Sequence, residues 1–105
     1  MRSYHLLNSM VQDKDTSDFY DRLKKQLTEN TSWPSEYLYK FIVPSDLEKI
    51  AIIESIFDGT NAIIKTKEST KGTYTSVSIH VLMDSPDKVI EKYLEVSSVE
   101  GVISL

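Results

Sequence analysis

Residues 61–84 read NAIIKTKESTKGTYTSVSIHVLMD, and this stretch decides the fold. Two runs rich in β-branched residues, 61–68 and 73–84, stand on either side of Lys71 and Gly72. β-Branched and aromatic residues favour strands, and glycine supplies the positive φ that a tight turn requires. The stretch therefore predicts a β-hairpin.

The second strand of this hairpin has two different faces, because side chains alternate between the faces of a sheet. One face is apolar and we expect helices to cover it; it holds Val77, Ile79, Val81 and Met83. The opposite, open face would carry Tyr74, Ser76, Ser78 and His80. By the same alternation Lys40, Lys65 and Lys67 also point outward.

The segments on either side of the hairpin supply further strands and helices. Residues 36–43, EYLYKFIV, alternate as a strand that Pro44 ends. Ser45-Asp46-Leu47-Glu48 predicts a capping box, in which the Ser45 hydroxyl accepts from the amide of Glu48, and Gly59 suits the end of that helix. Its expected apolar face holds Leu47, Ile50, Ile53, Ile56 and Phe57.

A second helix is expected to begin at Ser85-Pro86-Asp87, with a cap, a proline at the first helical position and an acid in the first turn. Apolar residues then keep helical spacing at Val89, Ile90, Tyr93, Leu94 and Val96. A short strand over 99–105 closes the chain. The order βαββαβ predicts an α+β, ferredoxin-like sandwich: a four-stranded antiparallel sheet with both helices on one face and strands one and three in the centre.

The N-terminal part precedes this domain, which we assign to residues 36–105. Residues 1–16 show no sustained period and are expected to form a flexible arm, in which Met10 could be the natural start. Residues 17–35 predict an extra amphipathic helix and a linker, since apolar residues recur at spacing four and Trp33-Pro34 then breaks the pattern. We expect this helix to pack near the first strand, within one chain or across a dimer, where it would cover Leu38, Ile42 and Ile63 on the open face. The alternative is that a partner covers that face.

Composition narrows the class of protein. The chain of 105 residues is 40% hydrophobic, which suits one globular domain. It has no cysteine, which removes disulfides, thiolate zinc sites and cysteine nucleophiles. No apolar run approaches the ~20 residues of a membrane span, and no secretory signal is evident. We therefore expect a soluble, cytoplasmic protein that does not enter a membrane.

The sequence shows no constellation that carries catalysis. The three glycines are isolated, so no phosphate-cradling loop is predicted. His5 and His80 have no paired ligand spacing around them, so no metal or cofactor is expected. The only arginines, Arg2 and Arg22, lie outside the predicted domain. We expect a protein that is not an enzyme, with no catalytic residues.

Nucleic-acid binding is disfavoured by two observations. The net charge is −4, which opposes non-specific attraction to phosphates. The segment from Lys71 aligns with the lysine-glycine-aromatic motif of RNA-recognition domains, but the stacking positions hold Thr73, Thr75 and Ser78 instead of flat rings. The lysines could still form a phosphate patch, or they could protect an edge strand from aggregation. The candidate binding residues are Lys40, Lys65, Lys67, Lys71, Gly72, Tyr74, Ser76, Ser78 and His80.

A family resemblance rests on Trp33-Pro34, on Tyr39-Lys40 and above all on the run 69–79, STKGTYTSVSI. On these residues the chain from about Phe19 to its end resembles the domain of unknown function 493 family, the YbeD-like, UPF0250-type small bacterial proteins. The resemblance implies a ferredoxin-like fold similar to the ACT regulatory domains that bind amino acids. It implies no established activity.

Together these observations predict a non-enzymatic regulatory or binding module for a small molecule or a protein partner, either as a monomer or as a homodimer. The alternative is nucleic-acid binding through a basic patch on the sheet and the hairpin.

Overall fold

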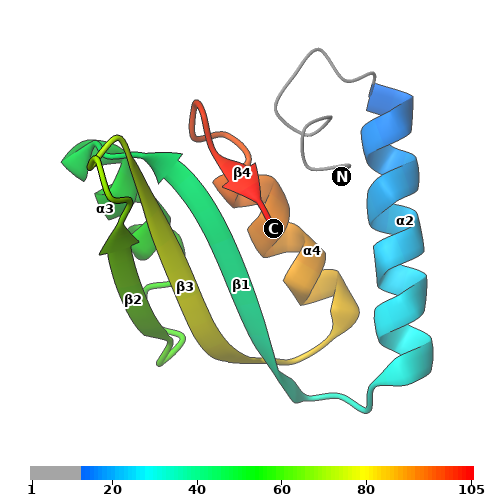
Figure 1. The fold of residues 1–105 in the computed structure, drawn as a ribbon. Helices are drawn as coiled ribbons and strands as arrows, with labels where there is room; N and C mark the ends of the chain where they lie inside the picture. The colour runs from blue at the N-terminus through cyan, green and yellow to red at the C-terminus, as the bar shows by residue number, and fades with distance from the viewer. Residues whose placement is uncertain (1–12) are drawn as a thin grey trace.

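The computed structural model describes residues 13–105, which form an α+β fold of three helices and a four-stranded antiparallel sheet (Figure 1). The strand order is β2-β3-β1-β4, so the first and third strands are central, as predicted. The elements are α2 (Asp13–Asn30), β1 (Ser35–Pro44), α3 (Leu47–Ile56), β2 (Ile63–Glu68), β3 (Tyr74–Met83), α4 (Pro86–Val96) and β4 (Ile103–Ser104).

The predicted hairpin is confirmed. Strands β2 and β3 pair antiparallel, and Gly72 has φ +75° in the turn between them. The longest pairing joins β3 to β1, from Ser35 opposite Met83 to Pro44 opposite Tyr74. This long ladder fixes which side chains of the two central strands lie side by side.

The core lies between the sheet and the helices α3 and α4, which lie on the same side of the sheet (Figure 1). The predicted covered face is confirmed, because Val77, Ile79, Val81 and Met83 are all buried. Strand β1 adds Tyr39, Phe41 and Val43 to the same face, and the helices add Ile53, Val89 and Val96. Alternation alone therefore places these strand residues correctly.

The helix starts agree with the prediction at α4 but not at α3. Ser85 Oγ accepts from the amide of Lys88 at 3.2 Å, with Pro86 in the first turn, as expected. At α3 the cap is Asp46, whose Oδ1 accepts from the Glu48 amide at 2.9 Å. The predicted cap, Ser45, instead shares a 2.7 Å hydrogen bond between its Oγ and Oγ1 of the buried Thr75. A buried hydroxyl needs a partner, and Asp caps a helix as well as Ser does.

Two residues that we expected on the apolar faces of the helices lie in solvent. Leu47 is 85% exposed and Leu94 is 48% exposed. Helix α3 ends at Ile56, before the predicted glycine, and Gly59 has its left-handed φ of +78° in the turn that follows. The buried faces of α3 and α4 are therefore narrower than the sequence pattern suggests.

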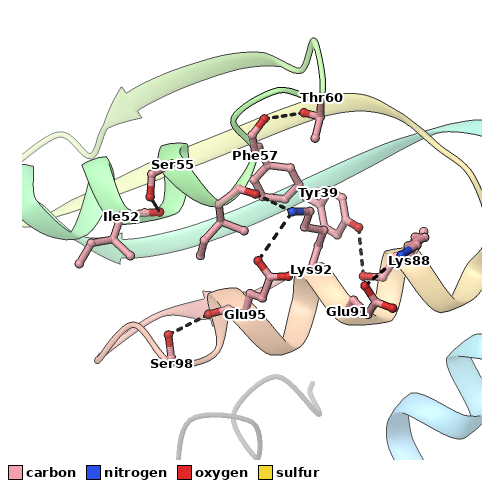
Figure 2. A network of polar contacts seen from close by, with 12 residues as sticks. Tyr39, Ile52, Ser55, Phe57, Thr60, Lys88, Glu91, Lys92, Glu95 and Ser98 are labelled. Carbon is pink, nitrogen blue, oxygen red and sulfur yellow. Dashed lines mark hydrogen bonds and ion pairs between the residues drawn. The ribbon is translucent and has the colours of Figure 1, made fainter.

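Lys92 of α4 ties the two covering helices together. Its Nζ donates to the carbonyl oxygen of Ile56, the last residue of α3, at 2.6 Å, and lies 5.5 Å from the centre of the Phe57 ring (Figure 2). Glu95 Oε1 is 3.7 Å from the same ammonium. The last carbonyls of a helix lack internal partners and favour a nearby cation. The last turn of α3 has no basic residue, so the Lys92 ammonium supplies the positive charge there.

Helix α2 begins at Asp13, earlier than the predicted start near Asp18, so the last part of the predicted arm is helical. The rest of that arm, including Met10, lies outside the described residues. The helix packs beside α4 (Figure 1), where Tyr20 is buried and Lys24 Nζ lies 2.7 Å from Asp87 Oδ1. The prediction that this helix packs against the domain is confirmed.

The prediction that α2 covers the open face of its own chain is wrong. Phe19, Leu23 and Leu27 pack against the helix-side core cluster instead. An amphipathic stripe shows that a helix buries one side, but two apolar surfaces were available to it. Leu38 and Ile63 therefore remain exposed on the open face, whereas Ile42 is partly buried.

Candidate functional site

The candidate site is the open face, the face of the sheet that α3 and α4 do not cover. Strand pairing arranges its side chains in rows that cross the sheet from β2 through β3 to β1. One row, which we name the apolar row, consists of Ile63, His80 and Leu38. The next, the lysine row, consists of Lys65, Ser78 and Lys40. Beyond it lie Lys67, Ser76 and Ile42, and on the other side of the apolar row lie Leu82 and Glu36.

Three large apolar side chains share the end of the face around the apolar row. Leu38 is 59% exposed, Ile63 is 61% exposed and Leu82 is 60% exposed. Side chains directly opposite on neighbouring strands have Cβ atoms about 5 Å apart, and diagonal neighbours lie within reach of long side chains. The three residues thus form one apolar patch. Single exposed leucines are ordinary, whereas contiguous apolar patches mark binding surfaces.

An imidazole and a carboxylate lie beside this patch. His80 Nε2 is 3.3 Å from Glu36 Oε1, and both side chains are more than half exposed. Such an exposed pair contributes little to stability. The strand register places Glu36 on one side of the apolar row and the lysine row on the other side.

The lysine row brings together residues that are distant in sequence. Lys40 and Lys65 lie on either side of Ser78, and their Cα atoms are about 10 Å apart, since neighbouring strands are about 4.8 Å apart. Lys67 is in the adjacent row, where its carbonyl accepts from Ser76 Oγ at 3.3 Å. Among residues 17–105 the ion pairs use Lys24, His80, Lys88 and Lys92, and none of them includes a lysine of the open face.

The remaining predicted residues lie apart from the lysine row. Lys71 and Gly72 are in the hairpin turn, where the positive φ of Gly72 explains the glycine. Tyr74 is half-exposed opposite Pro44 at the far end of the sheet. The structure therefore gathers Lys40, Lys65, Lys67, Ser76 and Ser78, places His80 in the apolar row and leaves the turn separate.

Several of the hollows that the described residues form at the sheet are shallow. One of about 240 Å³ is lined by Ile42, Lys67, Glu68, Ser69, Tyr74 and Ser76. A second of about 260 Å³ lies around Ile63, His80 and Leu82, and a third of about 310 Å³ lies beyond it around Thr60, Asp84 and Lys92. Pockets for small molecules typically measure roughly 300–1,000 Å³. The hollows are at or below the lower end of that range.

Two residues of the site were missed by sequence reasoning, Leu82 and Glu36. Both carry the signal that would have found them, because Leu82 has the parity of His80 and Glu36 has the parity of Leu38. Within residues 13–105 there is no group of three or more His, Cys, Asp or Glu side chains placed to hold a metal ion. None of the helices in that range is both long and apolar enough to span a bilayer.

Comparison with known proteins identifies curated relatives of this chain. The UPF0250 proteins of Haemophilus influenzae strains PittEE and PittGG are each 42% identical to this chain over 53 residues, which is 50% of this chain and 56% of the relative. The chain thus spans about half the length of the curated relatives it matches. No solved structure matches the chain. The family model described as "Protein of unknown function (DUF493)" matches residues 28–105, and the chain belongs to that family.

Proposed function

We propose that this protein is a non-enzymatic binding module that docks a protein partner on its open sheet face. One observation carries the proposal: Leu38, Ile63 and Leu82 are exposed together on three adjacent strands. Removing such side chains from water is favourable by about 25 cal/mol per Å² of apolar surface. A partner that covers the patch gains this free energy without any change in the fold.

The shape of the face favours a macromolecule over a small molecule. The two hollows around Ile63 and Ile42 are shallow and small, whereas the apolar and lysine rows lie next to each other on one surface of the sheet. A bound small molecule is normally enclosed over most of its surface. A protein surface needs no such enclosure, and an apolar centre with a charged rim is the usual anatomy of a protein interface.

The topology supports the comparison with regulatory domains. The order βαββαβ from β1 onward and the strand order β2-β3-β1-β4 are those expected of a ferredoxin-like, ACT-like domain. Likeness of fold is an analogy and does not define an activity. It supports a regulatory role for the binding module, with the open face as the surface that acts.

Site-specific photo-crosslinking in the source cells tests the proposal. A photoreactive amino acid at Ile63 lies in the apolar row, and the same group at Ile52, which is also exposed but lies on α3, is the matched control. We expect protein adducts from position 63 and few from position 52. Equal yields from the two positions, or no protein adduct from position 63, would refute the proposal.

Nucleic-acid binding is the second candidate, favoured by the lysine row with Lys67 beside it and by the absence of ion pairs to these lysines among residues 17–105. The exposed ring of Tyr74 lies two rows beyond the lysine row, and the net charge of −4 opposes phosphate binding. Fluorescence polarisation with single-stranded RNA and DNA at two salt concentrations decides between the candidates. Binding that weakens steeply with salt and is lost in Lys40→Ala would favour the nucleic acid.

A further inference from the structure

We propose that the protein partner on the open face is a second copy of this chain, packed face to face about a two-fold axis that runs along the apolar row. This inference rests on the proposed function and names its partner. It follows from the positions of the charged residues on the face, because a two-fold axis brings each row of one copy onto a defined row of the other.

The rows determine which residues would meet. With the axis along the apolar row, Leu38, His80 and Ile63 each face their own copy across the interface. The rows on the two sides of the axis exchange places, so the lysine row of one copy lies over the row that holds Glu36 and Leu82 in the other. Because this rotation keeps each strand over its own copy, Lys40 faces Glu36 of the second copy.

This charge pair can form only between chains. Lys40 and Glu36 are four residues apart on β1, which places them about 13 Å apart within one copy. The two-fold arrangement supplies the pair twice, once from each copy. The alternative two-fold axis, parallel to the strands through β3, would place Lys65 over Lys40 of the second copy and oppose like charges. The charges therefore select one arrangement of the two.

The size of the face sets the strength of the expected dimer. Strands β1 and β3 are each 10 residues long, β2 has 6 residues and β4 has 2. At about 3.3 Å per residue and about 4.8 Å between strands, they offer on the order of 450 Å² per copy, or about 900 Å² in total. That total is below the range of about 1,200–2,000 Å² that stable protein interfaces bury, and it is typical of weak association. Twisted sheets also pack at about −30° to each other, which leaves the central rows in contact. We expect a dimer that dissociates on dilution.

Charge reversal and mixing test the inference. The measurement is the molar mass by sedimentation equilibrium from micromolar to near-millimolar protein, with circular dichroism to establish that each variant is folded. We expect wild type to associate, and Lys40→Glu and Glu36→Lys to be monomers, because each opposes like charges across the axis. An equimolar mixture of the two variants should form a heterodimer, since both pairs are then complementary. Lys88→Glu, on α4, is the control and should associate like wild type.

Each outcome decides the inference. A wild-type monomer at all concentrations, association that Lys40→Glu leaves unchanged, or a mixture of the two variants that stays monomeric would overturn it. The crosslinking experiment separates this failure from failure of the proposed function. Adducts from position 63 with a protein of a different mass would refute the second copy but retain the docking surface, whereas no adduct together with a monomer would refute both.

Discussion

The indole Nε1 of Trp33 donates a hydrogen bond of 3.0 Å to the carbonyl oxygen of Leu27 in the last turn of α2. The bond satisfies one of the carbonyls that a helix end leaves without a partner, and the Trp33 ring packs against the core cluster. This contact fixes the reversal of the chain between α2 and β1. It holds α2 beside α4 and leaves the open face uncovered.

Leu23→Asp tests this placement of α2. Leu23 is partly buried against the core cluster, so the change removes apolar contact and forces a carboxylate toward it. We expect the free energy of unfolding to fall by about 1–2 kcal/mol, which lowers the melting temperature by several degrees. Lys25→Asp, on an exposed position of the same helix, is the control. If Leu23→Asp melted like wild type, α2 would not be part of the folded unit.

Lys92→Met tests the link between α3 and α4. Methionine keeps most of the apolar stem but removes the ammonium that contacts the Ile56 carbonyl. We expect the free energy of unfolding, measured with urea, to fall by about 1.5–2 kcal/mol, a typical contribution of a hydrogen bond to a charged group. The matched change is Lys88→Met, since Lys88 lies on the same helix in an exposed ion pair with Glu91. The free energy of unfolding of Lys88→Met should fall by less than about 0.5 kcal/mol. An equal fall in Lys92→Met and Lys88→Met would contradict the linking role of Lys92.

The buried tyrosines predict a loss of stability in alkali. Burial raises the pKa of Tyr20, Tyr37, Tyr39 and Tyr93 above the ordinary value of 10.0. Their hydroxyls are partly used within the fold, because Tyr39 donates to the Val89 carbonyl at 3.0 Å and the Tyr37 and Tyr93 hydroxyls lie 2.8 Å apart. The unfolded chain releases these protons near pH 10.0 while the folded chain retains them. Stability is therefore complete below that pH and falls above it, by up to about 1.4 kcal/mol per pH unit for each tyrosine.

Denaturant unfolding between about pH 8 and about pH 11 measures this alkaline loss. Tyr93→Phe should make the decline shallower, because one buried hydroxyl no longer titrates on unfolding. Tyr74→Phe changes a ring outside the buried cluster and serves as the control. A stability that stayed constant up to about pH 11 would contradict the raised pKa values of the cluster.

The parts of the fold that follow from local sequence were predictable, and the parts that depend on distant residues were not. Period-two alternation identified Val77 and Ile79 as buried, since a strand has only two faces. The cap of α3 was misassigned because the role of Ser45 depends on Thr75, thirty residues further along the chain. The predicted position of α2 was wrong because it too depends on distant residues. An apolar stripe shows that a helix buries one side but does not specify the surface that it packs against.

The candidate site also has features that follow from local sequence and features that depend on distant residues. Alternation placed Lys40, Lys65 and Ser78 on the open face, but only the pairing of β1 and β2 with β3 shows that they share one row. Lys71 was grouped with them because it is near in sequence, whereas it lies in the turn at the end of the hairpin. The exposure of Leu82 was predictable from the sequence, because Leu82 has the same parity on β3 as His80.

The most direct test of the central claim, that the open face is a binding surface, is the crosslinking yield from Ser78 when the apolar row is made polar. A photoreactive group at Ser78 lies between Lys40 and Lys65, and the variant Leu38→Thr with Ile63→Thr changes two exposed side chains beside it. The fold should tolerate these changes within about 0.5 kcal/mol per site, because surface substitutions seldom cost more. We predict that the adducts formed in the source cells with wild-type Leu38 and Ile63 are lost in the variant. Adducts that persist undiminished in the folded variant would contradict the claim.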